Sequence, residues 1–104
     1  MKSLFIEFMG DSPVVRVLDY LLTERELDFS ITDIAENAGI GRATLYRIFD
    51  KLIKNKMIVF TREVGKAKLY KLNSKDLRIK KLIELDNMLA LEELKGKERI
   101  EITA

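Results

Sequence analysis

A helix–turn–helix pattern occupies residues 31–58, ITDIAENAGIGRATLYRIFDKLIKNKMI, and the remaining elements can be placed around it. Thr32 is the predicted N-cap of a first short helix, and Gly39 stands where a helix would end in a left-handed residue. Gly41 is the predicted N-cap of a second helix, which should run from about Arg42 to Asn55. Two short helices joined by so tight a turn restrict the fold to helix–turn–helix arrangements.

The second predicted helix has one apolar face and one polar, basic face. Apolar residues recur at spacings of three and four, which predicts a buried stripe of Leu45, Ile48, Phe49 and Leu52. The opposite face carries Ala43, Tyr46, Arg47, Asp50 and Lys54, and is flanked by Arg42 and Lys51. A helix of this kind after a tight turn is suited to reading the major groove of DNA.

Two helices are predicted before this pattern. The first should lie within residues 1–10, where Leu4, Phe5, Phe8 and Met9 have helical spacing and Gly10 follows them. The second should begin at Ser12 as N-cap and Pro13 as first helical residue, with an apolar face of Val14, Val17, Leu18, Leu21 and Leu22. Residues 27–31, LDFSI, alternate and predict a short strand or an extended link.

After Asn55 the apolar period changes from that of a helix to that of a strand. Ile58, Phe60 and Val64 are predicted to point one way on a first strand, and Tyr70 and Leu72 form the inner pair of a second. The loop between the strands is Gly65-Lys66-Ala67, which predicts a hairpin. Its basic residues are Arg62, Lys66, Lys68 and Lys71. The order helix, short strand, two helices and hairpin is that of a winged helix.

A last helix is predicted to be capped at Asn73-Ser74 and to end near Lys95, with Gly96 as terminator. It carries a wide apolar stripe made of Leu77, Leu82, Leu85, Met88 and Leu89, which Ile79, Ile83, Leu91 and Leu94 extend around the helix. This is more apolar surface than one small domain is expected to cover. We therefore predict a homodimer with an interface of Leu82, Leu85, Met88, Leu89, Phe5 and Phe8. The alternative is that the two terminal helices cover each other within one chain.

Charge is distributed unevenly, although the formal net charge is only +2. Residues 1–41 hold three basic and eight acidic side chains, residues 42–75 hold ten and two, and residues 76–104 hold six and seven. A positive block that starts at the second helix of the motif is typical of a surface that contacts phosphate. The alternative interpretation is a solvated, lysine-rich surface.

Composition narrows the possible functions. The chain has 104 residues, enough for one domain with an appended helix. It contains no cysteine and no histidine, and its Ser and Asp residues show no nucleophile–base spacing, so we expect neither an enzyme nor a metal or cofactor site. No apolar run approaches 20 residues, and the N-terminal run is broken by Glu7, which predicts a cytoplasmic protein without a membrane span or signal peptide.

Residues 12–72 resemble the winged helix–turn–helix transcriptional regulators of bacteria and archaea, of the multiple-antibiotic-resistance and arsenic-repressor (MarR/ArsR) type. The resemblance rests on residues 31–58 and on the hairpin VFTREVGKAKLYKL. It implies a dimer in which each recognition helix enters a major groove while each wing touches the minor groove or backbone. Such regulators often have Ser or Thr at the position of Gly41 and Gly at that of Lys56, where Asn55 is expected to supply the left-handed residue. Metal sensing through Cys and His ligands is excluded.

The predicted fold is mainly α with a small β-hairpin (α+β). We divide it into an N-terminal docking helix (1–10), a winged helix–turn–helix domain (11–73), a C-terminal dimerisation helix (74–95) and a tail (96–104). The predicted function is that of a sequence-specific transcriptional regulator that binds double-stranded DNA as a homodimer, on an inverted repeat. The alternative is a winged helix used as a protein–protein interaction module. Binding of a small-molecule effector is left open.

The residues predicted to contact DNA are Arg42, Ala43, Thr44, Tyr46, Arg47, Lys51, Arg62, Lys66 and Lys68. Arg47 is the candidate for a bidentate bond to guanine, its alternatives being a phosphate contact or an ion pair with Asp50. The hydroxyls of Thr44 and Tyr46 are candidates for phosphate contacts, or these two residues pack within the domain. Lys66 and Lys68 would contact phosphate, or they only keep the hairpin edge soluble.

Overall fold

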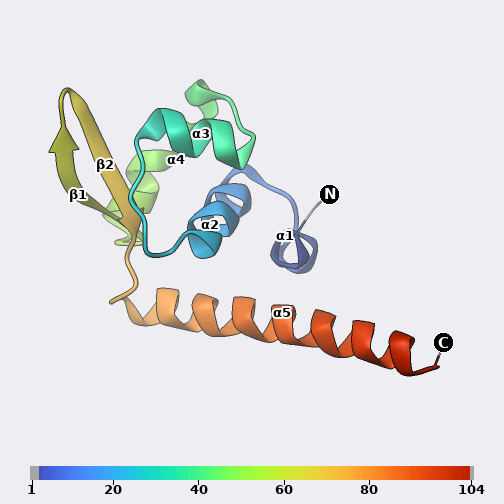
Figure 1. The fold of residues 1–104 in the computed structure, drawn as a ribbon. Coiled ribbons are helices and arrows are strands. Elements are labelled where there is room, and N and C mark those ends of the chain that lie inside the picture. Colours follow the sequence, from blue (N-terminus) through green and yellow to red (C-terminus); the bar gives the residue numbers. More distant parts are fainter. Residues whose placement is uncertain (1–2, 104) are drawn as a thin grey trace.

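The computed structural model describes residues 3–103, with side chains described for residues 3–96. Five helices and one hairpin follow each other in the order α1 (Leu4–Met9), α2 (Pro13–Thr23), α3 (Ile31–Ala38), α4 (Arg42–Lys54), β1 (Ile58–Val64), β2 (Ala67–Leu72) and α5 (Leu77–Thr103) (Figure 1). The predicted combination of helices with a small β-hairpin is confirmed.

Serine side chains begin the first three helices. The Oγ atoms of Ser3, Ser12 and Ser30 each accept a hydrogen bond from the backbone N–H three residues later, at 3.1, 3.2 and 3.2 Å. The start of α2 is therefore as predicted. The predicted cap at Thr32 is wrong, because Ser30 takes that place and Thr32 lies within the first turn of α3.

The two helices of the helix–turn–helix motif end in the same way. At the end of α3, Gly39 is left-handed (φ +70°), and the Ile40 N–H bonds to the Ala35 carbonyl at 3.0 Å. At the end of α4 the left-handed residue is Lys56 (φ +58°), not Asn55 as predicted.

Hydrogen bonding explains the place of this left-handed residue. The Lys56 N–H bonds to the Ile53 carbonyl and the Met57 N–H to the Leu52 carbonyl, both at 3.0 Å. This pair of bonds requires the positive φ one residue later than the sequence suggested.

Most elements contribute to one apolar core. The buried side chains are Phe5 from α1, Val17, Leu18, Leu21 and Leu22 from α2, Ile34, Ala35 and Ala38 from α3, Leu45, Phe49 and Leu52 from α4, Ile58 and Leu72 from the strands, and Ile79 from α5. Ile48, predicted to be buried, is only half-buried at the rim. The stripe along α4 is therefore turned inward, and its polar face is turned to solvent.

The hairpin is antiparallel and contains an irregularity. Ile58 pairs with Leu72 and Phe60 with Tyr70, but the register then shifts, so that Arg62 pairs with Leu69. The predicted alternation from Ile58 through Phe60 to Val64 is therefore wrong beyond the shift. The turn is Gly65-Lys66, with Gly65 at the expected positive φ of 61°.

The link between α2 and α3 pairs with the hairpin. Phe29 and Tyr70 exchange two backbone hydrogen bonds, each 2.8 Å long. The predicted extended link is confirmed, and a single β-bridge pairs it with strand β2 of the hairpin.

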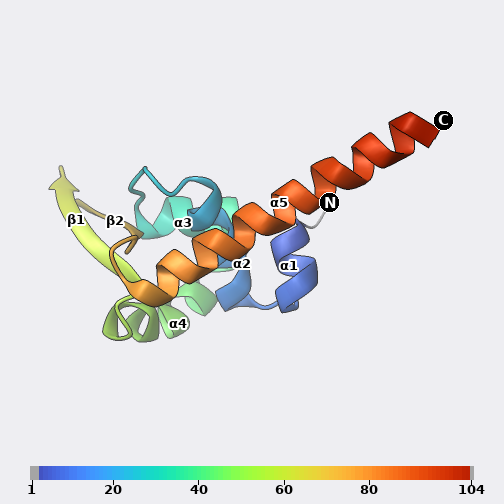
Figure 2. The ribbon, with the colours of Figure 1, turned by 90° about the horizontal axis from the view of Figure 1, so that it is seen from below.

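Helix α5 begins later than predicted and extends further. The predicted cap at Asn73-Ser74 is wrong, because the helix begins at Leu77 and it is the Asp76 carboxylate that accepts from the Arg78 N–H, at 2.8 Å. The helix then passes through Gly96 to Thr103. The predicted end at Gly96 is wrong, because a glycine inside a helix costs only about 1 kcal/mol and ends it only where a left-handed residue follows the last turn. Figures 1 and 2 show α5 running along the domain, with its C-terminal part extending past α1, away from the hairpin.

Two polar contacts join the start of α5 to the end of α4. Asn73 donates from Nδ2 to the Lys56 carbonyl at 2.8 Å, and Arg78 donates to the Asn55 carbonyl. Further along, the Arg25 guanidinium lies 3.4 Å from Asp86, which ties the end of α2 to α5. Among the described residues, no helix is long and apolar enough to cross a membrane.

Candidate nucleic-acid interface

Helix α4 presents the predicted residues on its outer side. Arg42, Ala43, Tyr46, Arg47 and Lys51 are exposed, and Thr44 is half-buried. The buried side chains of Leu45, Phe49 and Leu52 fix this orientation, because they occupy the opposite face of the same helix. The positions agree with the sequence analysis, and contact of these residues with DNA stays a prediction.

A hydroxyl in the first turn of α4 positions the Arg47 side chain without neutralising its charge. Arg47 donates from a terminal nitrogen to the Thr44 hydroxyl at 3.2 Å. A hydroxyl partner carries no charge, so the guanidinium keeps its full attraction for phosphate or for a guanine edge. Gly41, the N-cap, provides no side-chain acceptor for the helix.

The hairpin carries two kinds of cation. Lys66, in the turn, and Lys68, one residue into β2, are exposed as predicted. Arg62 instead bonds to the Asp28 carboxylate, at 3.0 Å from Nε and 3.3 Å from a terminal nitrogen. The Thr61 hydroxyl donates to the same carboxylate at 2.6 Å.

Asp28 therefore ties the hairpin to the link before α3. The hydrogen bonds from Arg62 and Thr61 lower the pKa of Asp28, and Asp28 in turn raises the pKa of Arg62. Arg62 is thus less available for phosphate than Lys66 and Lys68. Sequence analysis did not find Asp28, since it lies 34 residues from Arg62 and no local spacing relates the two.

Aromatic contacts set the hairpin against α4. The Tyr70 ring meets the Phe49 ring edge-on, with centroids 4.8 Å apart, and Phe60 meets Tyr70 at 5.9 Å. Together with the Phe29–Tyr70 bridge, these contacts hold the basic turn of the hairpin at a fixed place relative to the outer face of α4.

The predicted dimer residues fall into three groups. Phe5 is 1% exposed and lies in the core of its own chain, so its assignment to an interface is wrong. Leu82, Leu85 and Leu89 are half-buried against that core. Met88 and Phe8 are each 64% exposed.

Two apolar residues of α5 outside the predicted set are also exposed, Leu91 at 52% and Leu94 at 58%. Helical periodicity places Met88 and Leu91 on the side of α5 away from Ile79, whereas Leu94 lies about 60° from Ile79 around the helix. We call Met88 and Leu91 the outer face of α5.

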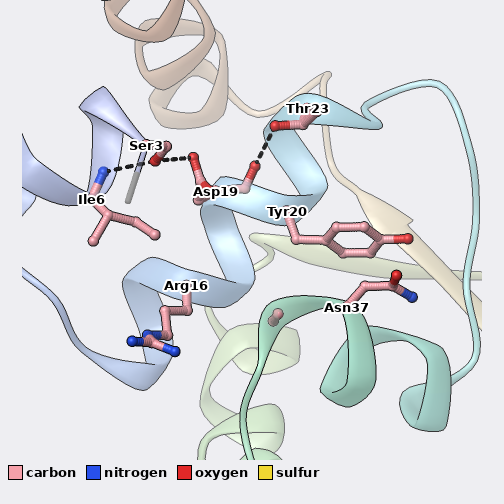
Figure 3. Close-up of a pocket in the computed structure, with 8 residues that line it drawn as sticks. Ser3, Ile6, Arg16, Asp19, Tyr20, Thr23 and Asn37 are labelled. Carbon is pink, nitrogen blue, oxygen red and sulfur yellow. Dashed lines mark hydrogen bonds between the residues drawn. The ribbon is translucent and has the colours of Figure 1, made fainter. Parts of the chain in front are cut away.

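A polar hollow of about 570 Å³ lies between α1, α2 and α3 (Figure 3). Ser3 donates to Asp19 at 2.8 Å, and the Thr23 hydroxyl donates to the Asp19 carbonyl at 3.0 Å. The bond from Ser3 docks α1 onto α2, whereas the bond from Thr23 lies within α2. Phe8 of α1 stays exposed. Among the described residues, no three acidic side chains are grouped so as to hold a metal ion.

No protein-family model and no curated protein sequence matches this chain. Solved structures do match it. The adhesin competence repressor AdcR of Streptococcus pyogenes has a TM-score of 0.60 at 16% identity, over 86% of this chain and 66% of that one. ZitR of Lactococcus lactis, solved in complex with DNA, has a TM-score of 0.60 at 15% identity, over 86% and 60%. This chain thus spans less than two thirds of the length of either protein.

A third match is nearer to this chain in length. Sso10a-2, a DNA-binding protein from Sulfolobus solfataricus, has a TM-score of 0.52 at 20% identity, over 85% of this chain and 92% of that one. At these identities the comparisons establish the fold. The resemblance to winged helix–turn–helix regulators, first seen in residues 12–72, is therefore confirmed as a winged-helix fold.

Proposed function

We propose that this chain is a transcriptional regulator that binds double-stranded DNA, with α4 in the major groove and the hairpin on the adjacent backbone or minor groove. The observation that carries the proposal is the fixed placement of two basic surfaces. Arg42, Arg47 and Lys51 line the outer side of α4, and Lys66 and Lys68 lie at the turn of a hairpin held to α4 by ring contacts. A helix with a neighbouring basic hairpin can contact base edges and phosphates at the same time.

The DNA-binding part of the proposal is tested by the salt dependence of affinity for random duplex. The logarithm of the association constant should fall linearly with the logarithm of the salt concentration, since each phosphate that the protein neutralises releases counterions. Lys66→Ala combined with Lys68→Ala should reduce the slope by roughly 1–2 units per bound chain.

A matched control removes the same charge elsewhere. Lys80→Ala with Lys81→Ala deletes two exposed lysines from α5 and should leave the slope unchanged. A slope that is equal for all three proteins would remove the hairpin from the interface. If the chain bound no duplex at any salt concentration, the alternative of a protein-binding winged helix would be favoured.

We also propose that the regulator is a homodimer joined through the outer face of α5. At about 100° per residue, Met88 and Leu91 lie on the side of α5 away from the fully buried Ile79, and both are more than half exposed. Apolar side chains on two sides of one helix need two packing partners, and a single chain supplies only one.

Charge favours an antiparallel pairing of the two helices. With the two-fold axis between Leu89 and Ala90, Met88 would face the partner subunit's Leu91, and Glu84 would face the partner subunit's Lys95. A parallel pairing would instead place each of these charges opposite its own copy, which is repulsive. The two-fold symmetry of such a dimer calls for an inverted-repeat operator.

Sedimentation equilibrium of charge-swapped variants tests this pairing. Glu84→Lys and Lys95→Glu should each raise the dimer dissociation constant, and combining them should restore it, because the opposite charges meet again. A wild-type mass of one chain at micromolar concentration would contradict the dimer. A double variant no better than either single variant would contradict the antiparallel pairing.

A further inference from the structure

A groove of about 680 Å³ lies between α4 and the hairpin. Its lining includes Tyr46, Phe49, Asp50, Phe60, Lys68 and Tyr70. The groove is flanked by the two basic surfaces of the proposed DNA interface. Tyr46 and Lys68 belong to that interface, and Phe49 and Tyr70 position the hairpin, but duplex binding assigns no role to Asp50 or to the exposed part of Phe60.

Aromatic rings make up much of the groove. From the core outward, Phe49, Tyr70 and Phe60 contact each other edge to face, at 4.8 and 5.9 Å between successive centroids. Phe60 on β1 and Tyr46 on α4 are each 53% exposed. Both rings keep about half of their surface exposed, although Phe60 contacts Tyr70. Two half-exposed rings on the two elements that border the groove are available to a flat ligand.

The charged groups define what kind of flat ligand fits. Lys68 can pair with a phosphate, and the Asp50 carboxylate can accept from an exocyclic amino group, as acidic side chains do from cytosine. An apolar peptide would remove water from both charges without pairing them. A nucleotide presents an aromatic ring, an amino donor and a phosphate together, so it offers a partner to the exposed rings, to Asp50 and to Lys68.

We propose that this groove binds an unpaired nucleobase, preferably cytosine or adenine, so that the chain binds single-stranded or locally melted DNA in addition to duplex. The base would stack on Phe60 and Tyr46, as bases do on aromatic side chains of single-strand-binding proteins. The inference deepens the proposed function, because Tyr46 and Lys68 would serve both modes of binding, whereas Phe60 and Asp50 are not needed for duplex.

Fluorescence anisotropy with a labelled twelve-nucleotide oligo(dC) and a random duplex separates the two modes. Phe60→Leu and Tyr46→Leu keep an apolar side chain but remove the π face. Each should weaken oligo(dC) binding at least about fivefold, the lower end of base–aromatic stacking. Phe60 lies outside the proposed duplex interface, so Phe60→Leu should change duplex affinity less than about twofold. Tyr46 belongs to that interface, so Tyr46→Leu is judged on oligo(dC) binding alone. Phe8→Leu, which changes an exposed phenylalanine on α1, is the matched control and should alter neither.

The role of the Asp50 carboxylate is tested separately, by base preference. Wild type should prefer oligo(dC) to oligo(dT) of the same length, and Asp50→Asn should remove that preference, because thymine offers no exocyclic amine. Unchanged oligo(dC) binding in Phe60→Leu and Tyr46→Leu would overturn the proposal. Equal losses of oligo(dC) and duplex binding in Phe60→Leu would also overturn it, since Phe60 would then be an ordinary duplex contact.

Failure of this inference is distinguishable from failure of the proposed function. Binding of oligo(dC) that depends on Phe60, without any duplex binding, would retain the groove and remove the proposed duplex interface. Duplex binding that depends on Lys66, with no single-strand binding, would do the reverse.

Discussion

Helices α4 and α5 differ in how much of their apolar surface is buried within the domain. Every fully buried residue of α4 lies on one stripe, made of Leu45, Phe49 and Leu52, and its other side is polar and basic. Among the described side chains of α5, only Ile79 is fully buried, and the apolar residues of the outer face are more than half exposed. A helix with one apolar stripe can bury that stripe within its own domain, and its other side is then free to bind a charged ligand. A helix with apolar residues on two sides needs a second apolar surface to bury the other side.

The largest predicted effect is a difference in stability between these two helices. Leu45→Ala removes a fully buried side chain and should lower the free energy of unfolding by about 2–5 kcal/mol. Leu91→Ala removes a half-exposed side chain and should change the free energy of unfolding of a dilute, monomeric sample by less than about 0.5 kcal/mol. Urea unfolding at low protein concentration gives both numbers, and comparable losses would contradict the different roles assigned to the two helices.

The next effect concerns the polar side of α4. Arg47→Ala should weaken binding to a selected operator by about 1–3 kcal/mol, since a bidentate arginine–guanine contact is worth that much in discrimination. Binding to random duplex should stay nearly intact. The measurement is a titration of variant and wild type with both duplexes, and equal losses on the two would make Arg47 a phosphate contact only.

A smaller gain in stability is expected where α4 ends. Lys56 is held at φ +58°, a conformation that costs a non-glycine residue about 1 kcal/mol. Lys56→Gly should therefore stabilise the domain by up to about 1 kcal/mol. Asn55→Gly is the matched control, since Asn55 has a φ of −82° and gains nothing from glycine. A loss of stability in Lys56→Gly, measured by thermal unfolding, would mean that the lysine side chain has a role at this turn.

The smallest effect is a pH dependence at the start of α5. Hydrogen bonds from Arg78 lower the pKa of Asp76 from 3.8 to about 2. A depressed carboxyl pKa stabilises the fold fully above the unfolded value, and this contribution is lost as the pH falls from about 4 through about 2. The difference in Tm between wild type and Asp76→Asn should therefore be largest near neutral pH and shrink below pH 4. A constant difference down to pH 2 would assign the effect to helix capping that is independent of charge.

Local signals in the sequence predicted most of the fold. Ser12-Pro13, Gly39 and Gly65 each mark a helix start, a helix end or a turn through their own backbone preferences, and the structure confirms all three. The errors arose where two signals competed. Ser30 displaced Thr32 as a cap, and Gly96 lies inside a helix that continues beyond it.

The candidate site could be predicted only in part. Exposure of the α4 residues follows from helical periodicity, which is a local property. The pairing of Asp28 with Arg62 and the aromatic groove depend on which strand meets which helix, and on a shift in strand register that leaves no mark in the sequence. Likewise, Phe5 and Phe8 have the same apolar character, and only the docking of α1 decides that the first is buried and the second exposed.

The assignment of DNA binding to α4 and the hairpin, rather than to α5, is tested most directly by NMR. Amide signals of the ¹⁵N-labelled protein would be followed while a duplex is added. We expect chemical-shift changes concentrated at residues 42–51 and 62–68, while the signals from the outer face of α5 stay unchanged. Changes concentrated on α5, with the signals of α4 and the hairpin unchanged, would contradict the assignment of DNA binding to α4 and the hairpin.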